Sequence, residues 1–352
     1  MPELLLHIGT HKTGTTSIQR FCGNNRDALR EHGVWYPSAS VGPFPKHYAH
    51  HRIAHAIAGN DDKFDVSSAR EFFAAVEKNM KAGERALLSA EPLYRHMLPD
   101  PARASSGKPN EAERREQFQR YAQVVRDCLS DFDVTVMVML RRQDLFVESL
   151  YAEQVLATAY ERPIERFMQE RDHLLNYAER LDIWAEAFGA ERISVRTFEP
   201  ATFVHPIERT FVEWLGLDWD ESFAIGSKHN VTPSRTFVEF KRMMNTTGHG
   251  GDVNTVYRKW VEQVGERVGT DGAPDLGKYY LQPRDRVELL DRFADGNRQV
   301  AERFCGRTQL FSEGPERELA RYVDRPSLGD DQFRAIAREL FRMIAEDVTA
   351  SA

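Results

Sequence analysis

A short segment near the N-terminus has the residue types and spacing of an anion-binding loop. Residues 9 to 17 read Gly-Thr-His-Lys-Thr-Gly-Thr-Thr-Ser and lie between an apolar run, Leu4 to Ile8, and an amphipathic run that begins at Ile18. A loop between a strand and a helix directs the unpaired N–H groups and the positive dipole end of the helix at the carboxyl edge of a sheet. We therefore expect a phosphate or a similar anion to bind here.

The loop differs from a Walker A loop at its lysine position. Gly9 and Gly14 have the Walker A spacing, but Thr15 stands where the lysine would be and Lys12 lies inside the loop. The lysine of a Walker A loop reaches the β- and γ-phosphates of a nucleoside triphosphate. Hydrolysis of ATP or GTP is therefore disfavoured.

The run Lys12-Thr13-Gly14-Thr15-Thr16 resembles the 5'-phosphosulfate loop of sulfotransferases that use 3'-phosphoadenosine 5'-phosphosulfate (PAPS). That loop typically reads as lysine, a small residue, glycine and two threonines. The resemblance implies that the loop holds the donor and that Lys12 acts in catalysis by neutralising charge on the oxygen that bridges sulfur to the leaving phosphate. The donor-binding residues expected here are Thr10, His11, Lys12, Thr13, Gly14, Thr15, Thr16 and Ser17.

A second basic segment follows the apolar run Val134 to Leu140. Arg141 and Arg142 come directly after this run, and Asp144 is a suitable N-cap for a helix that carries Ser149. The planar guanidinium group forms charge-assisted, often bidentate bonds with phosphate. Arg141 and Ser149 have the spacing of the family's second motif, and the resemblance implies that they bind the 3'-phosphate of the donor. Arg142 replaces an aspartate that is usual in cytosolic eukaryotic members, so the pattern is closer to bacterial carbohydrate-type sulfotransferases.

Glu91 is the first candidate for the base that removes a proton from the acceptor. It follows the apolar run Ala86 to Ala90 and precedes Pro92. Because proline biases the residue before it away from the helical region, we expect Glu91 to be extended at the sheet edge, facing the same crevice as Lys12. The family places a catalytic histidine or glutamate near this point. The alternative is that Glu91 pairs with a loop arginine or caps a helix.

Three histidines recur at helical spacing, His47, His51 and His55. If the segment is helical, their imidazoles lie along one face. No carboxylate accompanies them in the sequence and sulfuryl transfer requires no metal, so we predict no metal site here. His51 is a second candidate for acceptor contact or for the base.

Strands and helices that alternate along the chain must position these residues. The candidate strands are Leu4 to Ile8, Ala86 to Ala90, Val134 to Leu140 and Ile193 to Phe198. The candidate helices are Ile18 to Leu29 (ending before Gly33), Ala69 to Lys81, Glu111 to Leu129, Asp144 to Thr158, Leu174 to Phe188, Pro206 to Leu215 and Arg284 to Phe304. This alternation predicts an α/β fold, a parallel sheet with helices on both faces. The resemblance to sulfotransferases implies that this is their P-loop NTPase-like fold, with helical additions at the C-terminal end.

We expect a single sulfotransferase domain over residues 1–352. Within it, residues 99–110 are predicted to be a mobile insertion, residues 246–277 a Gly-rich lid or contact segment, and residues 332–348 a C-terminal helix. The run from Lys228 to Ser234 resembles a late segment of bacterial sulfotransferases and is given no catalytic role.

The composition is that of an ordinary globular protein, with 41% hydrophobic and 29% charged residues and a formal net charge of -7. That charge argues against a surface that binds nucleic acid or an anionic membrane. No apolar stretch approaches the roughly 20 residues that span a bilayer. The three cysteines have no metal-ligand spacing and the N-terminal residues do not read as a signal peptide, so we expect a cytoplasmic protein.

The sequence thus predicts a PAPS-dependent sulfotransferase that acts on a hydroxyl or amine of a carbohydrate or small metabolite, with no metal or redox cofactor. The acceptor and the oligomeric state are left open. The alternatives are a P-loop kinase of a small metabolite, which would bind Mg-ATP tightly, and a non-catalytic regulator, which would bind the nucleotide without turning it over.

Overall fold

The computed structural model describes residues 1–99, 109–226, 234–246, 277–324 and 328–350. The predicted insertion at 99–110, the Gly-rich segment at 246–277 and the run from Lys228 to Ser234 lie outside these residues except at their ends. The chain divides into two compact units. The first contains Met1–Arg142, His173–Ser227 and Phe293–Ser312, and the second contains Gln143–Asp172, Lys228–Arg292 and Glu313–Ala352. The assignment to a single domain stays a prediction.

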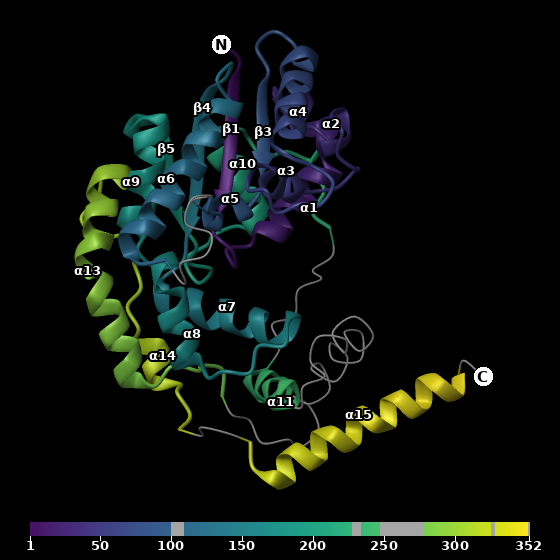
Figure 1. Ribbon diagram of the computed structural model, residues 1–352, viewed down its shortest axis with the longest axis vertical. Coiled ribbons are helices and arrows are strands. Elements are labelled where there is room, and N and C mark those ends of the chain that lie inside the picture. The colour runs from purple at the N-terminus through teal and green to yellow at the C-terminus, as the bar shows by residue number, and fades with distance from the viewer. Residues whose placement is uncertain (100–108, 227–233, 247–276, 325–327, 351–352) are drawn as a thin grey trace. The chain divides into compact units, whose positions relative to one another are not determined.

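A five-stranded parallel sheet forms the centre of the first unit, with strand order β2-β3-β1-β4-β5 (Figure 1). The strands are β1 (Glu3–Gly9), β2 (Val34–Trp35), β3 (Arg85–Ser89), β4 (Asp133–Leu140) and β5 (Ile193–Thr197). The four strands expected from apolar runs are confirmed. β2 was not expected, because two residues carry no readable periodicity. Since the strands are parallel, the carboxyl ends of β1, β3 and β4 meet at one edge of the sheet.

Helices cover both faces of this sheet, which confirms the predicted α/β fold. Leu4, Leu6 and Ile8 of β1 pack on one face with α3, α4, α6 and α9, and Leu5 packs on the other with α1, α2 and α10. This alternation is expected, because successive side chains of a strand point to opposite faces. The helices are α1 (Thr15–Asn24), α2 (Arg26–Glu31), α3 (His51–Ile57), α4 (Val66–Asn79), α5 (Pro92–Arg95), α6 (Glu111–Cys128), α9 (Tyr177–Phe188) and α10 (Ile207–Trp214).

The first predicted helix is divided in two. The chain leaves helical geometry at Asn25, with φ -109° and ψ 31°, so α1 ends and α2 begins there. The Asn25 side chain stabilises the break, because its amide donates to the carbonyls of Phe21 and Ala224, each at 2.9 Å. Gly33, expected just after the helix, has φ +80°.

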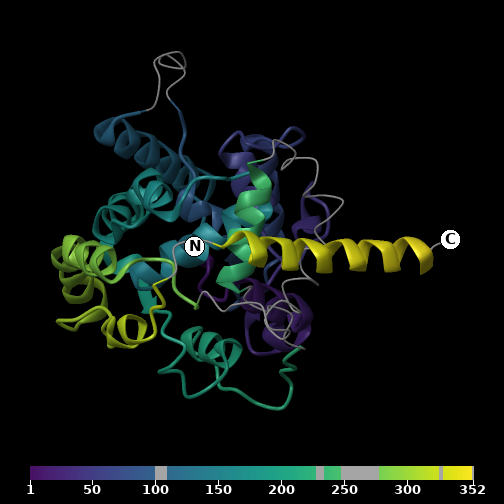
Figure 2. The same cartoon turned by 90° about the horizontal axis from the view of Figure 1, so that it is seen from below.

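The second unit is built around α7 (Gln143–Ala157), which packs against α8 and α11. The other helices are α8 (Ile164–Arg171), α11 (Arg235–Asn245), α14 (Glu316–Ala320) and α15 (Asp330–Ala350), together with the first part of α13 (Pro283–Cys305), whose remainder belongs to the first unit. α15 is one unbroken helix in both views (Figures 1 and 2). Among the helices that the described residues form, none is both long and apolar enough to cross a membrane.

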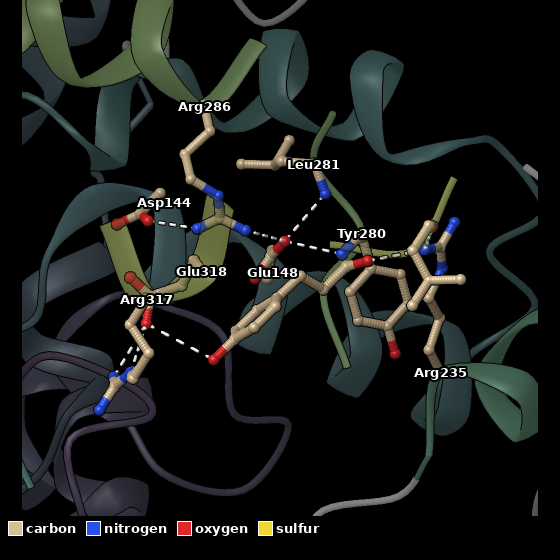
Figure 3. Close-up of polar contacts among 10 residues, drawn as sticks. Asp144, Glu148, Arg235, Tyr280, Leu281, Arg286, Arg317 and Glu318 are labelled. Atoms are coloured by element: carbon tan, nitrogen blue, oxygen red, sulfur yellow. Dashed lines mark hydrogen bonds and ion pairs between the residues drawn. The ribbon is translucent and has the colours of Figure 1, made fainter. Parts of the chain in front are cut away.

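A buried ion cluster connects α7 to Arg286 of α13 and to the residues just before α13, within the second unit (Figure 3). Arg286, only 1% exposed, pairs with Asp144 and Glu148, which lie one turn apart on α7. Oε1 of Glu148 also accepts the backbone N–H groups of Tyr280 and Leu281, at 2.7 and 2.8 Å. Burial raises the pKa of Glu148 to about 7, although Arg286 and these N–H groups oppose the rise. Asp144 is therefore not the predicted N-cap: α7 begins at Gln143, and Asp144 is a buried ion-pair partner in its first turn.

Candidate functional site

The loop between β1 and α1 has an unusual backbone. Gly9, Lys12 and Gly14 have φ values of +88°, +63° and +77°. Among the described residues, Lys12 is the only one other than glycine that has a positive φ. A side chain in this left-handed region costs about 1–2 kcal/mol, and such strain is concentrated at functional sites. A Cβ on Gly14 would also lie 3.2 Å from Cγ1 of Ile207 and 3.3 Å from Cε2 of Phe198, so these side chains would have to shift to accommodate it.

Two threonines fix the loop to the sheet. The N–H and the hydroxyl of Thr10 both donate to the carbonyl of Met139 in β4, at 2.9 and 3.1 Å. The hydroxyl of Thr13 donates to the carbonyl of Thr10 at 2.6 Å. Both side chains are fully buried, and each hydroxyl has only one proton to give. Thr10 and Thr13 therefore shape the loop, and their hydroxyl protons are already used.

The rest of the loop contains donors that have no acceptor among the residues that the structure describes. In the part of the chain that the structure describes, no hydrogen bond involves the Lys12 ammonium or the hydroxyls of Thr15, Thr16 and Ser17. The backbone N–H groups of residues 11 to 17 likewise have no backbone acceptor among the described residues. Unpaired donors around the N-terminus of a helix, where the helix dipole is positive, form an anion-binding site.

Arg141 lies beside this loop, and its binding of a 3'-phosphate stays a prediction. Its Nη1 donates to the carbonyl of Lys12 at 2.9 Å, and its guanidinium lies 5.7 Å from the ring centre of Phe198. The hydroxyl of Tyr177 donates to the carbonyl of Arg141 and so fixes the end of β4. Ser149 lies half-buried on α7, in the second unit, and its pairing with Arg141 stays a prediction.

Glu91 lies against the loop, but its predicted backbone conformation is wrong. A Cβ on Gly9 would lie 2.6 Å from Cβ of Glu91, so only glycine fits at the end of β1. Glu91 is helical, with φ -63° and ψ -21°, instead of extended. The turn that ends β3 outweighs the preference of a residue before proline for an extended backbone. In this turn the N–H of Leu93 donates to the carbonyl of Ala90, and Pro92 is well suited to the first position of α5.

The Glu91 carboxylate is the centre of a buried polar network. Its Oε2 accepts from Nε2 of His51 and from Nε2 of Gln19, both at 2.6 Å. Nε2 of Gln19 also lies 3.2 Å from Oγ of Ser89, which is 2.8 Å from Nδ1 of His7. Sequence reasoning identified Glu91 and His51 but missed Gln19, Ser89 and His7, which occupy ordinary positions on a helix and two strands.

These contacts determine which groups carry charge. Burial alone would raise the pKa of Glu91, but the hydrogen bond and charge of His51, with smaller contributions from His11 and Gln19, lower it to about 2. Burial lowers the pKa of His7 to about 4 and that of His11 to about 3, and for His11 the nearby Arg95 adds to the effect. Near neutral pH, Glu91 is therefore ionised, and His7 and His11 are neutral.

The other histidines do not form the expected row. α3 begins at His51, so His47 lies before the helix and only His51 and His55 share a helical face. The ring of His55 is bonded to that of His96, with 2.9 Å between Nδ1 and Nε2. Within the described ranges there is no group of three or more histidine, cysteine, aspartate or glutamate side chains that could hold a metal ion.

No protein-family model matches the chain, and no curated protein matches it in sequence. Among solved structures, a sulfotransferase from Alicyclobacillus acidocaldarius is similar, with a TM-score of 0.36 and 15% identity, over 65% of this chain and 87% of that one. Similarity at this level carries no argument about function. The chemistry of this chain is therefore inferred from the geometry of its own site.

Proposed function

We propose that this chain transfers a sulfuryl group from PAPS to a hydroxyl or amine of an acceptor, with a carbohydrate or small metabolite as the acceptor. The observation that supports this most is the juxtaposition of two features at one sheet edge: a loop with unpaired donors around Lys12, and the buried Glu91–His51 pair against Gly9. The first suits a sulfated phosphate, and the second suits removal of a proton.

In the proposed reaction, the acceptor oxygen or nitrogen attacks sulfur in line with the bond to the 5'-phosphate. The new bond to sulfur forms as the bond from sulfur to the bridging oxygen breaks, and that oxygen keeps the electron pair. Lys12 stabilises the negative charge that develops on the leaving phosphate, together with the N–H groups of the loop. Thr15, Thr16 and Ser17 would donate to the phosphosulfate oxygens, and Arg141, with Ser149, would bind the 3'-phosphate.

The proton of the acceptor is proposed to go to His51. Glu91 was the first candidate for this role, but the hydrogen bonds that it accepts from His51 and Gln19 lower its pKa and make its carboxylate a weaker base. The His51 side chain is also more exposed than that of Glu91, 29% against 10%. Because Nε2 of His51 bonds to Glu91, Nδ1 is left to accept the proton, and Glu91 stabilises the imidazolium that results.

The direct test is to incubate the protein with isotopically labelled PAPS and a panel of sugars, alcohols and amines, and to detect labelled products by mass spectrometry. We expect a labelled sulfate ester or sulfamate with at least one acceptor, formed about 10²–10³ times more slowly by Lys12→Met. Phosphoryl transfer from Mg-ATP, with no sulfated product, would favour the kinase alternative. Nucleotide binding without transfer to any acceptor or to water would favour the regulator.

A further inference from the structure

We propose that Gln19 is a positioning residue that fixes the Glu91 carboxylate for its work with His51, and that it links this pair to the donor loop. The inference rests on the proposed function. Gln19 lies on α1, the helix whose N-terminus carries the anion-binding loop, and its side chain is fully buried. Its bond to Oε2 of Glu91, at 2.6 Å, is as short as the bond from His51 to the same oxygen.

The orientation of the Gln19 amide is determined by its neighbours. Its NH₂ group has two protons, and each has an acceptor. These acceptors are Oε2 of Glu91 at 2.6 Å and Oγ of Ser89 at 3.2 Å. Turning the amide over would place its oxygen against the ionised Glu91 carboxylate, which is repulsive. The amide is therefore a fixed donor that helps to keep Glu91 ionised.

Two buried atoms of this network have no hydrogen-bond partner among the described residues. They are Oε1 of Gln19 and Nε2 of His7. Buried polar atoms without partners cost free energy, and each one in a native protein requires an explanation. An apolar residue at position 19 would remove one of these atoms, but it would also remove a donor from Glu91. The explanation we infer is that the position is kept for its effect on Glu91.

The position of Gln19 also connects the two halves of the reaction. The loop that would hold the donor and the amide that holds Glu91 belong to one short helix, α1. Gly9 makes a second connection, because Glu91 packs directly on it at the start of the loop. The donor loop and the Glu91 carboxylate are therefore connected both through α1 and through the direct contact at Gly9.

The test is a double-mutant cycle with Gln19→Met, Glu91→Gln and the double variant. Gln19→Met keeps the length of the side chain but removes the donor, and we expect turnover at saturating substrates to fall about 10- to 100-fold. Affinity for adenosine 3',5'-bisphosphate should change less than twofold. If Gln19 acts through Glu91, adding Gln19→Met to Glu91→Gln should cost almost nothing more. Equal losses in both backgrounds would overturn the proposal.

A matched control is Gln119→Met. Gln119 makes the same kind of amide–carboxylate bond, 2.8 Å to Glu186, but on the surface of the first unit, and its loss should leave turnover unchanged. Gln19→Glu is a second variant that keeps the shape and reverses the polarity. Two carboxylates at this distance share a proton as the pH falls, and the protonated one then donates as the amide did. Its turnover relative to wild type should therefore recover toward acidic pH, and a constant deficit would contradict the proposal.

The same four proteins of the cycle are unfolded in urea, which separates this inference from the proposed function. Non-additive changes in unfolding midpoint, with no sulfated product from wild type, would mean that the contact exists but that the function is wrong. Sulfuryl transfer by wild type would mean that the proposed function is right. If the two substitutions then had additive effects on both turnover and unfolding, Gln19 would not act through Glu91.

Discussion

Two clusters of polar side chains, one in each unit, are built in opposite ways. In the second unit, Arg286 has two carboxylate partners, and Glu148 also accepts two backbone N–H groups (Figure 3). In the first unit, the Lys12 ammonium and the hydroxyls of Thr15, Thr16 and Ser17 have no hydrogen-bond partner in the part of the chain that is described. Charges that are satisfied within the protein hold its elements together, whereas donors gathered without acceptors are available to a ligand. We therefore propose that the cluster around Arg286 contributes to stability and that the cluster around Lys12 takes part in the chemistry.

The largest effect should come from Glu91→Gln. The amide keeps the shape but cannot stabilise the His51 imidazolium, so turnover should fall by about 10²–10⁴. Affinity for adenosine 3',5'-bisphosphate should hardly change, because Glu91 is assigned to the acceptor side. The measurements are turnover at saturating substrates and calorimetric nucleotide binding, with folding checked by circular dichroism. Near-wild-type turnover in a folded protein would remove Glu91 from the mechanism.

Arg286→Met should act on stability instead. Removing one partner of a buried ion cluster leaves Asp144 and Glu148 uncompensated, so the free energy of unfolding should fall by about 3–5 kcal/mol in urea titrations. The control is Arg284→Met: this arginine is 84% exposed and its pair with Glu288 should be worth about 0–1 kcal/mol. Equal small losses from both variants would mean that the cluster is not what holds the second unit together.

Substitution of Lys12 should lower turnover without lowering stability, the reverse of what is expected for Arg286. Lys12→Met should lower turnover by about 10²–10³, the effect of losing one donor to a developing oxyanion. Lys12→Gly should do the same without lowering the free energy of unfolding, because glycine is favoured at a φ of +63°. A variant that lost stability along with turnover would place Lys12 with the structural cluster.

The smallest effect concerns the 3'-phosphate. Arg141→Ala should weaken nucleotide binding by about 1.5–3 kcal/mol for each charge-assisted bond lost. Some of this loss would come from the loop itself, since Arg141 also donates to the carbonyl of Lys12. The comparison with adenosine 5'-phosphosulfate separates the two contributions. If the substitution weakens both nucleotides equally, Arg141 does not recognise the 3'-phosphate.

Much of this architecture could be predicted from the sequence, because buried parallel strands are short apolar runs and the loop has a recognisable spacing. Asn25 was missed as a helix break because its side-chain bonds to Phe21 and Ala224 depend on the fold. The predicted conformation of Glu91 was wrong because the hydrogen-bonded turn that ends β3 outweighs the local preference of a residue before proline. Gln19 could not be found, since nothing in a helical sequence indicates which buried amide will meet a carboxylate from a distant part of the chain.

The most direct test of the central claim is which nucleotide the loop binds. Unfolding of the full chain should be measured alone, with adenosine 3',5'-bisphosphate and with Mg-ATP. At about 100 times its dissociation constant, the bisphosphate should raise the free energy of unfolding by roughly 2.7 kcal/mol. Mg-ATP at the same concentration should have a much smaller effect, because Lys12 is not at the Walker A position. Equal or greater stabilisation by Mg-ATP would contradict the account.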